Sequence, residues 1–291
     1  MEDRKIIIEY EDPLYIAIDF ETKVASQGYN VENAKNNLQE ALELYFDKEV
    51  NMEDMNLFST AGVDRPVTTL FMLMSVDGKI STGSLDNLDM DRDLPLINGL
   101  KEGLQQYYSI EETTDLFSLN TGRVMSKIGV NNKKGYHDKV GVRFVIVDNK
   151  PHLTKEGIDY LCHWVDKLLL VTTNKNHPAY DCYQYDNLEV ISQRQFNLHN
   201  LLAQLKLSYK CDRLTIQSGG NLNGLFLREK LIDYVDVVVA PVLVGGRNTP
   251  TLIDGESIRS VNELDKLGIL RLIDCIKLEN SYMRLKYEVV R

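Results

Sequence analysis

Apolar runs and helical patterns alternate along most of the chain. Residues 143–148 and 167–172 are apolar with few polar positions between them, as expected of strands buried in a parallel sheet. Leu198 and Leu201 begin an apolar helical spacing that precedes another apolar run, and Asn197 is the expected N-cap of that helix. This alternation predicts an α/β domain whose mostly parallel sheet is flanked by helices.

The two ends of the chain follow other patterns. Residues 270–278 and 282–290 are rich in β-forming side chains, which predicts a C-terminal antiparallel hairpin. At the N-terminus, two short strand patterns at 5–10 and 15–20 precede an amphipathic helix that is expected to begin after Asn30. The N-terminal pattern predicts a small α+β module separate from the main domain.

These patterns divide the chain into three expected parts. Residues 1–50 form the α+β module, residues 51–64 are a connector, and residues 65–291 form the α/β domain. The length of 291 residues and the 43% hydrophobic content are sufficient for one large packed core and a smaller one.

A diglycine marks the most informative turn in the α/β part. Gly219 and Gly220 follow an apolar run and precede Asn221 and Leu222, where a helix is expected to begin. Because glycine has no Cβ and the first amides of a helix are unpaired, a phosphate could approach the backbone here. The turn lacks the glycine spacing of the dinucleotide and P-loop fingerprints, so glycines needed only for packing are an equal alternative.

Composition narrows the classes of partner. The chain has 33 basic and 43 acidic residues, a formal charge of −10, which disfavours nucleic acids because the surface field repels polyphosphates. No apolar stretch reaches the length of a membrane span. The four cysteines and five histidines have no zinc-site spacing, so we expect no metal and a reducing, cytoplasmic location.

Several motifs, taken in order, resemble one family. Arg65 and Pro66 precede a strand that ends in Ser-Val-Asp-Gly-Lys at 75–79, and the later strand after the diglycine reaches Ala240 and Pro241. Residues from about 65 to 291 are therefore similar to the reductase domain of the riboflavin-biosynthesis deaminase/reductase, a member of the dihydrofolate-reductase-like superfamily. The zinc deaminase motif, His-x-Glu followed by Pro-Cys-x-x-Cys, does not occur in this chain.

The resemblance implies a dihydrofolate-reductase-like fold, NADPH as cofactor and a small-molecule substrate. In the family's reaction, a hydride passes to C1 of the ribosyl group of 5-amino-6-(5-phosphoribosylamino)uracil. Positioning of donor and acceptor can supply much of such catalysis. We expect a homodimer.

Ligands of open α/β sheets bind beyond the carboxyl ends of the strands, and this edge holds the candidate site. The resemblance implies that Asp77 is catalytic and that Gly122 and Arg123 match the start of a Gly-Arg-x-Thr turn, although the threonine does not follow in register. Arg123 is the expected partner of the 2′-phosphate. The other expected cofactor-binding residues are Thr173, Gly219, Gly220, Asn221 and Leu222, and the expected substrate-binding residues are Ser75, Phe71 and Ser218.

Two positions depart from the family. Its members usually carry a lysine where this chain has Phe71 and a glutamate where it has Ser218. The N-terminal module resembles the corresponding module of HicB-type antitoxins. A non-catalytic NADPH-binding or nucleotide-binding protein, regulatory or antitoxin-like, is therefore the alternative to a reductase.

Overall fold

A computed structural model describes residues 4–11, 14–48, 50, 55–59, 65–135 and 138–290. The chain divides into two compact units. One unit consists of Met1–Pro66 together with Asn197–Lys210, and the other consists of Val67–Phe196 together with Cys211–Arg291. Residues Asn197–Lys210, which were predicted to belong to the α/β domain, are thus grouped with the N-terminal residues.

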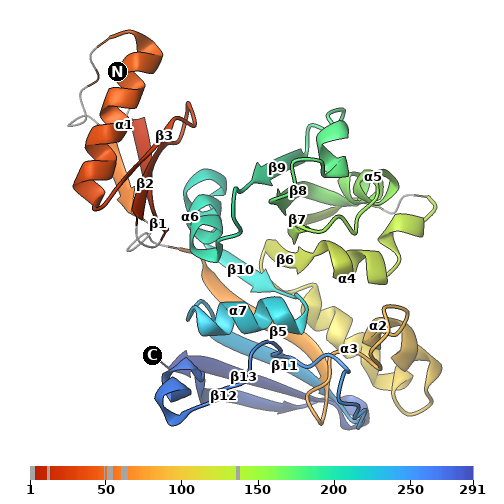
Figure 1. Cartoon of the computed structure of the whole chain (residues 1–291). Helices are drawn as coiled ribbons and strands as arrows, with labels where there is room; N and C mark the ends of the chain where they lie inside the picture. The colour runs from red at the N-terminus through yellow and green to blue at the C-terminus, as the bar shows by residue number, and fades with distance from the viewer. Residues whose placement is uncertain are drawn as a thin grey trace. The chain divides into compact units, whose positions relative to one another are not determined.

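A mostly parallel sheet of nine strands forms the larger unit (Figure 1). Seven strands run parallel, whereas β13 pairs antiparallel with β11 and β12 pairs antiparallel with β13. The predicted α/β class and the C-terminal hairpin are confirmed. In spatial order the strands are β12 (Ile269–Lys277), β13 (Met283–Val290), β11 (Tyr234–Ala240), β5 (Val67–Ser75), β10 (Arg213–Ile216), β6 (Phe117–Thr121), β7 (Val140–Val147), β8 (Val165–Thr172) and β9 (Leu188–Ser192).

Two helices of this unit begin where strands end. Helix α4 starts directly after β6, with the Thr121 side chain accepting from the amide of Val124 as N-cap. Helix α7 starts after β10 at the diglycine, as predicted, and its N-cap Gly219 offers no side chain. The helices are α2 (Met90–Asp93), α3 (Lys101–Glu111), α4 (Gly122–Lys127), α5 (Lys155–Trp164) and α7 (Gly220–Arg228), with short 3₁₀ turns at Leu94–Leu96, Val130–Asn132, Pro178–Asp181, Val261–Lys266 and Glu279–Ser281.

Two groups of buried side chains hold the larger unit together. One joins β7 and β8 to α4 and α5, and it includes Ile146, Leu168 and Ile158. The other joins β5 and β11 to α3 and includes Phe71 and Tyr282. The hydroxyl of the fully buried Tyr282 donates to the carbonyl of Leu100 at 2.8 Å, which satisfies its polar end.

The smaller unit contains a four-stranded sheet and a helix that buries one apolar face. The strands, in order, are β3 (Ala25–Gly28), β2 (Leu14–Asp19), β1 (Arg4–Glu11) and β4 (Met55–Ser59). Helix α1 (Val31–Phe46) begins after Asn30, whose side chain accepts from the amide of Asn33 at 2.8 Å, as predicted. Helix α6 (Leu198–Tyr209) is capped by Asn197, also as predicted.

The segment expected to be a connector contains a strand. Residues 55–59 form β4, which pairs in parallel with β1 and covers its second edge. Five residues between polar stretches are too short to show a periodic pattern, and the pairing depends on a partner about fifty positions away, so the sequence did not reveal the strand. The remaining residues of the predicted connector, 51–54 and 60–64, lie outside the described residues.

Candidate active site

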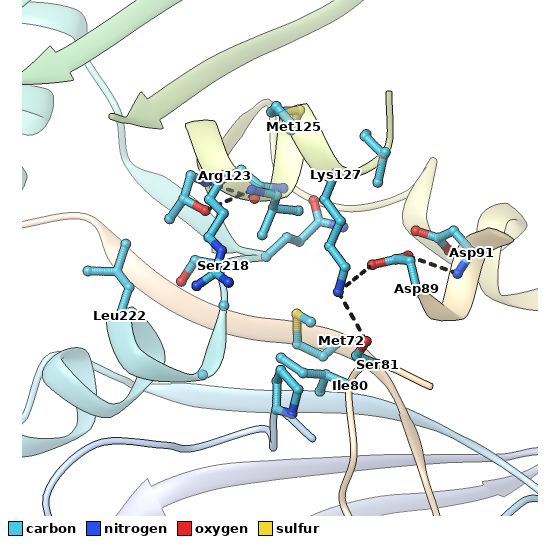
Figure 2. Close-up of a pocket in the computed structure, with 18 of the residues that line it drawn as sticks. Met72, Ile80, Ser81, Asp89, Asp91, Arg123, Met125, Lys127, Ser218 and Leu222 are labelled. Carbon is cyan, nitrogen blue, oxygen red and sulfur yellow. Dashed lines mark hydrogen bonds and ion pairs between the residues drawn. The ribbon is translucent and has the colours of Figure 1, made fainter. Parts of the chain in front are cut away.

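A cavity of about 1030 Å³ opens at the carboxyl ends of β6, β7 and β10, the edge where the site was expected. Its wall is built from the start of α4, the turn between β10 and α7, and the segment from Ile80 to Asp91 (Figure 2). Among the described residues, no group of histidine, cysteine, aspartate or glutamate could hold a metal ion. The cavity volume is at the upper end of the range typical of small-molecule sites.

The structure brings part of the predicted site together. The cavity wall includes Arg123, Ser218, Gly219, Gly220, Asn221 and Leu222. The other predicted site residues lie outside the wall, namely Phe71, Ser75, Asp77, Gly122 and Thr173. Residues predicted from the glycine turns are thus mostly at the cavity, whereas those predicted from β5 are not.

The beginning of α7 is the part of the wall that suits an anion. A Cβ built on Gly219 would meet no atom within 4 Å, so this residue faces open space. The amides of Leu222 and Asn223 both bond back to the carbonyl of Gly219, while those of Gly220 and Asn221 have no acceptor among the described residues. Two amides at the N-terminus of this nine-residue helix are therefore unpaired, and both residues line the cavity.

The second glycine and the serine before the pair have internal roles. A Cβ on Gly220 would lie 2.3 Å from the Asp254 carboxylate, so packing requires glycine there. Ser218 is fully buried, and its hydroxyl donates to Oδ1 of Asn223 at 2.6 Å. Asn223 in turn donates to the carbonyl of Leu252 at 2.9 Å. Both expected roles of the diglycine, packing and approach to a ligand, are thus compatible with this turn.

Helix α4 supplies two cations to the wall. Arg123 pairs with Asp86 at 2.7 Å, and the two side chains are 58% and 63% exposed. An exposed pair contributes about 1 kcal/mol or less, so a phosphate can compete for this guanidinium. One turn later, Nζ of Lys127 lies 3.0 Å from the Ser81 hydroxyl and 3.5 Å from Asp89.

Gly122 does not line the cavity because it makes room for a buried carboxylate. A Cβ at this position would lie 2.2 Å from Cγ of Asp148. Asp148 accepts from the amides of His152 and Leu153, and it contacts the rings of His152 and His177 at 3.0 and 3.1 Å. Burial alone would raise the pKa of Asp148, but these hydrogen bonds, led by that from His177, lower it. Gly122 therefore has a packing role here, and its contact with a cofactor phosphate stays a prediction.

Asp77 binds a loop of its own chain. Its carboxylate accepts from the Ser75 hydroxyl at 2.6 Å and from the amides of Val244 and Gly245 at 3.0 and 2.6 Å. The Ser75 hydrogen bond, followed by those two amides, lowers the pKa of Asp77 to about 2. A carboxyl group that stays ionised in this way is a poor proton donor at neutral pH, so its geometry favours fixing the loop over the predicted catalytic role.

Phe71 and Thr173 lie outside the wall, but each contacts a residue that lines it. Phe71 is buried and stacks on the Tyr107 ring with centroids 5.3 Å apart, and Tyr107 is the one of the two that lines the cavity. The amide of Thr173 donates to Oδ1 of Asn149 at 2.9 Å, and Asn149 is at the wall. The next two residues of β5, Met72 and Leu73, both line the cavity.

A carboxyl-rich part of the wall was not foreseen from the sequence. Asp89, Asp91 and Glu111 all line this part of the cavity. Burial raises the pKa of Asp89, although Lys127 opposes it, and burial raises the pKa of Glu111. Gln217 links this part to the sheet, since it donates to Glu111 and accepts from the Ser118 hydroxyl at 2.8 Å.

These carboxyl groups, and Lys127, come from a loop and from helix ends. Their sequence neighbourhoods contain no motif, and only the fold places them at one cavity. The acidic run from Asp86 to Asp93 is the one signal that could have drawn attention to the segment. A cavity at the carboxyl edge of a parallel α/β sheet is the usual place for a small-molecule site in this class of domain.

The chain belongs to the RibD C-terminal domain family, whose model matches residues 66–278. One curated relative, from Methanothermobacter thermautotrophicus, is 38% identical over 82 residues, which cover 28% of this chain and 38% of the relative. It is named 2,5-diamino-6-ribosylamino-4(3H)-pyrimidinone 5′-phosphate reductase. Riboflavin biosynthesis protein RibD of Actinobacillus pleuropneumoniae is 24% identical over 220 residues, covering 70% of this chain and 53% of that protein.

A solved structure shares the fold. Acinetobacter baumannii RibD, form 1, superposes with a TM-score of 0.55 at 15% identity, over 90% of this chain and 70% of that chain. The chain spans about half of the Actinobacillus protein and well under half of the Methanothermobacter one. No helix in the described part of the chain is long and apolar enough to cross a membrane.

Proposed function

We propose that the chain is an NADPH-dependent reductase of a ribosylaminopyrimidine phosphate. The observation that carries this proposal is the cavity at the carboxyl edge of the sheet, where Arg123 and the open start of α7 lie in a chain of the RibD C-terminal domain family. Relatives named as 2,5-diamino-6-ribosylamino-4(3H)-pyrimidinone 5′-phosphate reductases support the substrate class. The corresponding uracil compound is the second substrate to test.

The residues of the wall suit a nicotinamide dinucleotide. Gly219 leaves open space beside it, and the amides of Gly220 and Asn221 would hold a phosphate at the start of α7. Arg123 would bind a further phosphate, preferentially the 2′-phosphate, in exchange for its exposed partner Asp86. When bound, NADPH supplies the hydride.

The chain's own part in the reaction is to orient two ligands in one cavity. Asp77 fixes the loop that carries Val244 and Gly245, and Gln217 fixes the wall between Ser118 and Glu111. Rigid walls hold donor and acceptor close together, so the translational and rotational entropy of the two ligands is lost on binding and not in the chemical step. This effect can lower the barrier by about 7–11 kcal/mol. Such catalysis needs no strong acid or base at Asp77.

The proposed oligomer is a homodimer in the cytoplasm. Strand β12 is an edge strand with apolar residues that are 45% to 66% exposed, namely Ile269, Leu270, Leu272 and Ile273. An exposed apolar edge strand is unfavourable in a monomer, so a second copy is the occupant we expect. The structure describes all four cysteines; none is in a disulfide, and three are buried, as suits a reducing compartment.

The test is NADPH oxidation with the diaminopyrimidinone and uracil ribosyl phosphates, with melting temperature recorded in parallel. We expect turnover with at least one of them and stabilisation by NADPH, of about 2.7 kcal/mol at 100 times the dissociation constant. Stabilisation without turnover of either compound would favour a non-catalytic NADPH-binding protein. If millimolar NADPH does not stabilise the protein, the assignment of NADPH as the cofactor is wrong.

A further inference from the structure

The two cations of α4 lie in different surroundings within the same cavity. Arg123 is more than half exposed, whereas Lys127 and its partner Asp89 are each only 12% exposed. Figure 2 shows Lys127 reaching from α4 to Ser81 and Asp89, above Met72 and Ile80. Lys127 is thus a cation held in place inside the cavity, well away from bulk solvent.

The Lys127–Asp89 pair is fixed from both sides. The Ser81 hydroxyl accepts from Lys127 at 3.0 Å, and Ser81 donates to the carbonyl of Leu88 at 2.8 Å. Oδ1 of Asp89 accepts from the amide of Asp91 at 3.0 Å, which leaves Oδ2 toward Lys127. A lysine has three N–H donors and a carboxylate has about four acceptor positions, so both groups retain hydrogen-bonding capacity.

A fixed donor beside a fixed acceptor matches a hydroxyl group, which both accepts and donates. A phosphate matches poorly because Asp89, Asp91 and Glu111 share this part of the wall. When ionised, these carboxylates repel the negative charge of a phosphate. The surroundings therefore select an uncharged polyol over an anion.

We propose that Lys127 and Asp89 bind hydroxyl groups of the substrate's ribosyl portion and determine specificity for that sugar. The inference rests on the proposed reductase function. It also explains how a chain with Phe71 in the core and Ser218 bonded to Asn223 can bind a polar sugar. The charged pair is supplied by α4 and by the loop before α2 rather than by β5 and β10.

The test uses the full chain with Lys127→Met, which keeps the length of the side chain, and Asp89→Asn, which keeps an acceptor for the Asp91 amide. Lys127→Arg keeps the positive charge, so it tests whether a cation at this position is enough to retain substrate binding. Lys167→Met is the matched control, because Lys167 pairs with Glu189 at 3.1 Å, is 29% exposed and lies outside the cavity wall.

Each variant is assayed with four compounds: the ribosylaminopyrimidinone phosphate, its dephosphorylated form, and its 2-deoxyribosyl and 3-deoxyribosyl analogues. KM and kcat are measured by NADPH oxidation, and binding to the cofactor-free protein is measured by calorimetry. Lys127→Met should weaken binding of the ribosyl compound about 10-fold or more, whether or not the compound carries its phosphate. The loss should shrink on at least one deoxy analogue, while NADPH affinity and the control stay unchanged.

Other results overturn the proposal. A loss that disappears when the phosphate is removed would make Lys127 a phosphate ligand. An equal loss on all four compounds, or none, would make the pair a structural tie between α4 and the loop. Wild-type protein that binds NADPH but none of the compounds overturns this inference, whereas failure to bind NADPH overturns the proposed function.

Discussion

The amide of Gly245 donates to the Asp77 carboxylate at 2.6 Å, across 168 positions of the chain. The neighbouring amide of Val244 donates to the same carboxylate at 3.0 Å, and the Ser75 hydroxyl donates at 2.6 Å. The Ser-Val-Asp-Gly-Lys motif therefore joins the end of β5 to the loop after β11. This relationship gives the motif a structural purpose that needs no contact with a substrate.

Acid should release this loop. Because the pKa of Asp77 is lowered from 3.8 to about 2, its contribution to stability is present above pH 3.8 and is lost as the pH falls toward 2. The melting temperature of Asp77→Asn should therefore fall less than that of the wild type between pH 4 and pH 2, a window set by those two pKa values. Parallel curves for the two proteins would show that the hydrogen bonds to Asp77 contribute nothing.

The two glycines beside the cavity should respond differently to alanine. In Gly122→Ala, the new Cβ would lie 2.2 Å from Asp148, and such overpacking typically costs about 1–3 kcal/mol. Its melting temperature should drop by several degrees. In Gly219→Ala, the Cβ meets no atom within 4 Å, so stability should change less while NADPH binding weakens. The reverse assignment of the two effects would contradict the placement of the cavity.

Arg123 and Asp86 give a paired test of the 2′-phosphate contact. Arg123→Ala removes a charged hydrogen bond, so it should weaken NADPH binding by about 1.5–3 kcal/mol, or about 10- to 100-fold. NADH binding should change little. Asp86→Asn removes the competing partner at 2.7 Å and should tighten NADPH binding slightly. Calorimetric titration with both cofactors measures these effects, and equal losses for NADPH and NADH in Arg123→Ala would place the 2′-phosphate elsewhere.

The sequence predicted those features that local pattern determines. Buried strands, the diglycine start of α7 and the N-caps Asn30 and Asn197 follow from periodicity and capping chemistry, and the structure contains all of them. The site residues predicted from β5 and the turn after it, Phe71, Ser75 and Asp77, lie outside the cavity wall. A strand pattern does not say which face meets a cavity and which meets a helix, and here Phe71 faces Tyr107 of α3.

Long-range partners could not be read from the sequence. Lys127 and Asp89 are 38 positions apart and meet only because α4 and the loop before α2 border the same cavity. Strand β4 likewise depends on β1, a distant part of the chain. Such contacts depend on tertiary packing, which overrides local propensity.

Restoring the family's charges at the two departing positions should fail for this physical reason. Sequence comparison alone suggests that Phe71→Lys with Ser218→Glu would improve activity on the ribosylaminouracil phosphate. Phe71 and Ser218 are 1% and 0% exposed, so both new charges would need burial, and loss of the Phe71 ring alone typically costs about 3–5 kcal/mol. Thermal unfolding should show strong destabilisation, and a stable, more active double variant would refute this placement.

In the proposed function, this cavity carries hydride transfer from NADPH to a ribosylaminopyrimidine phosphate. The most direct measurement is turnover with NADPH deuterated at the transferable position of the nicotinamide, followed by mass analysis of the isolated product. We expect the ribityl product of the wild-type reaction to carry deuterium at C1 of its sugar chain. A protein that binds NADPH yet yields no deuterated product from either the diaminopyrimidinone or the uracil compound would contradict it.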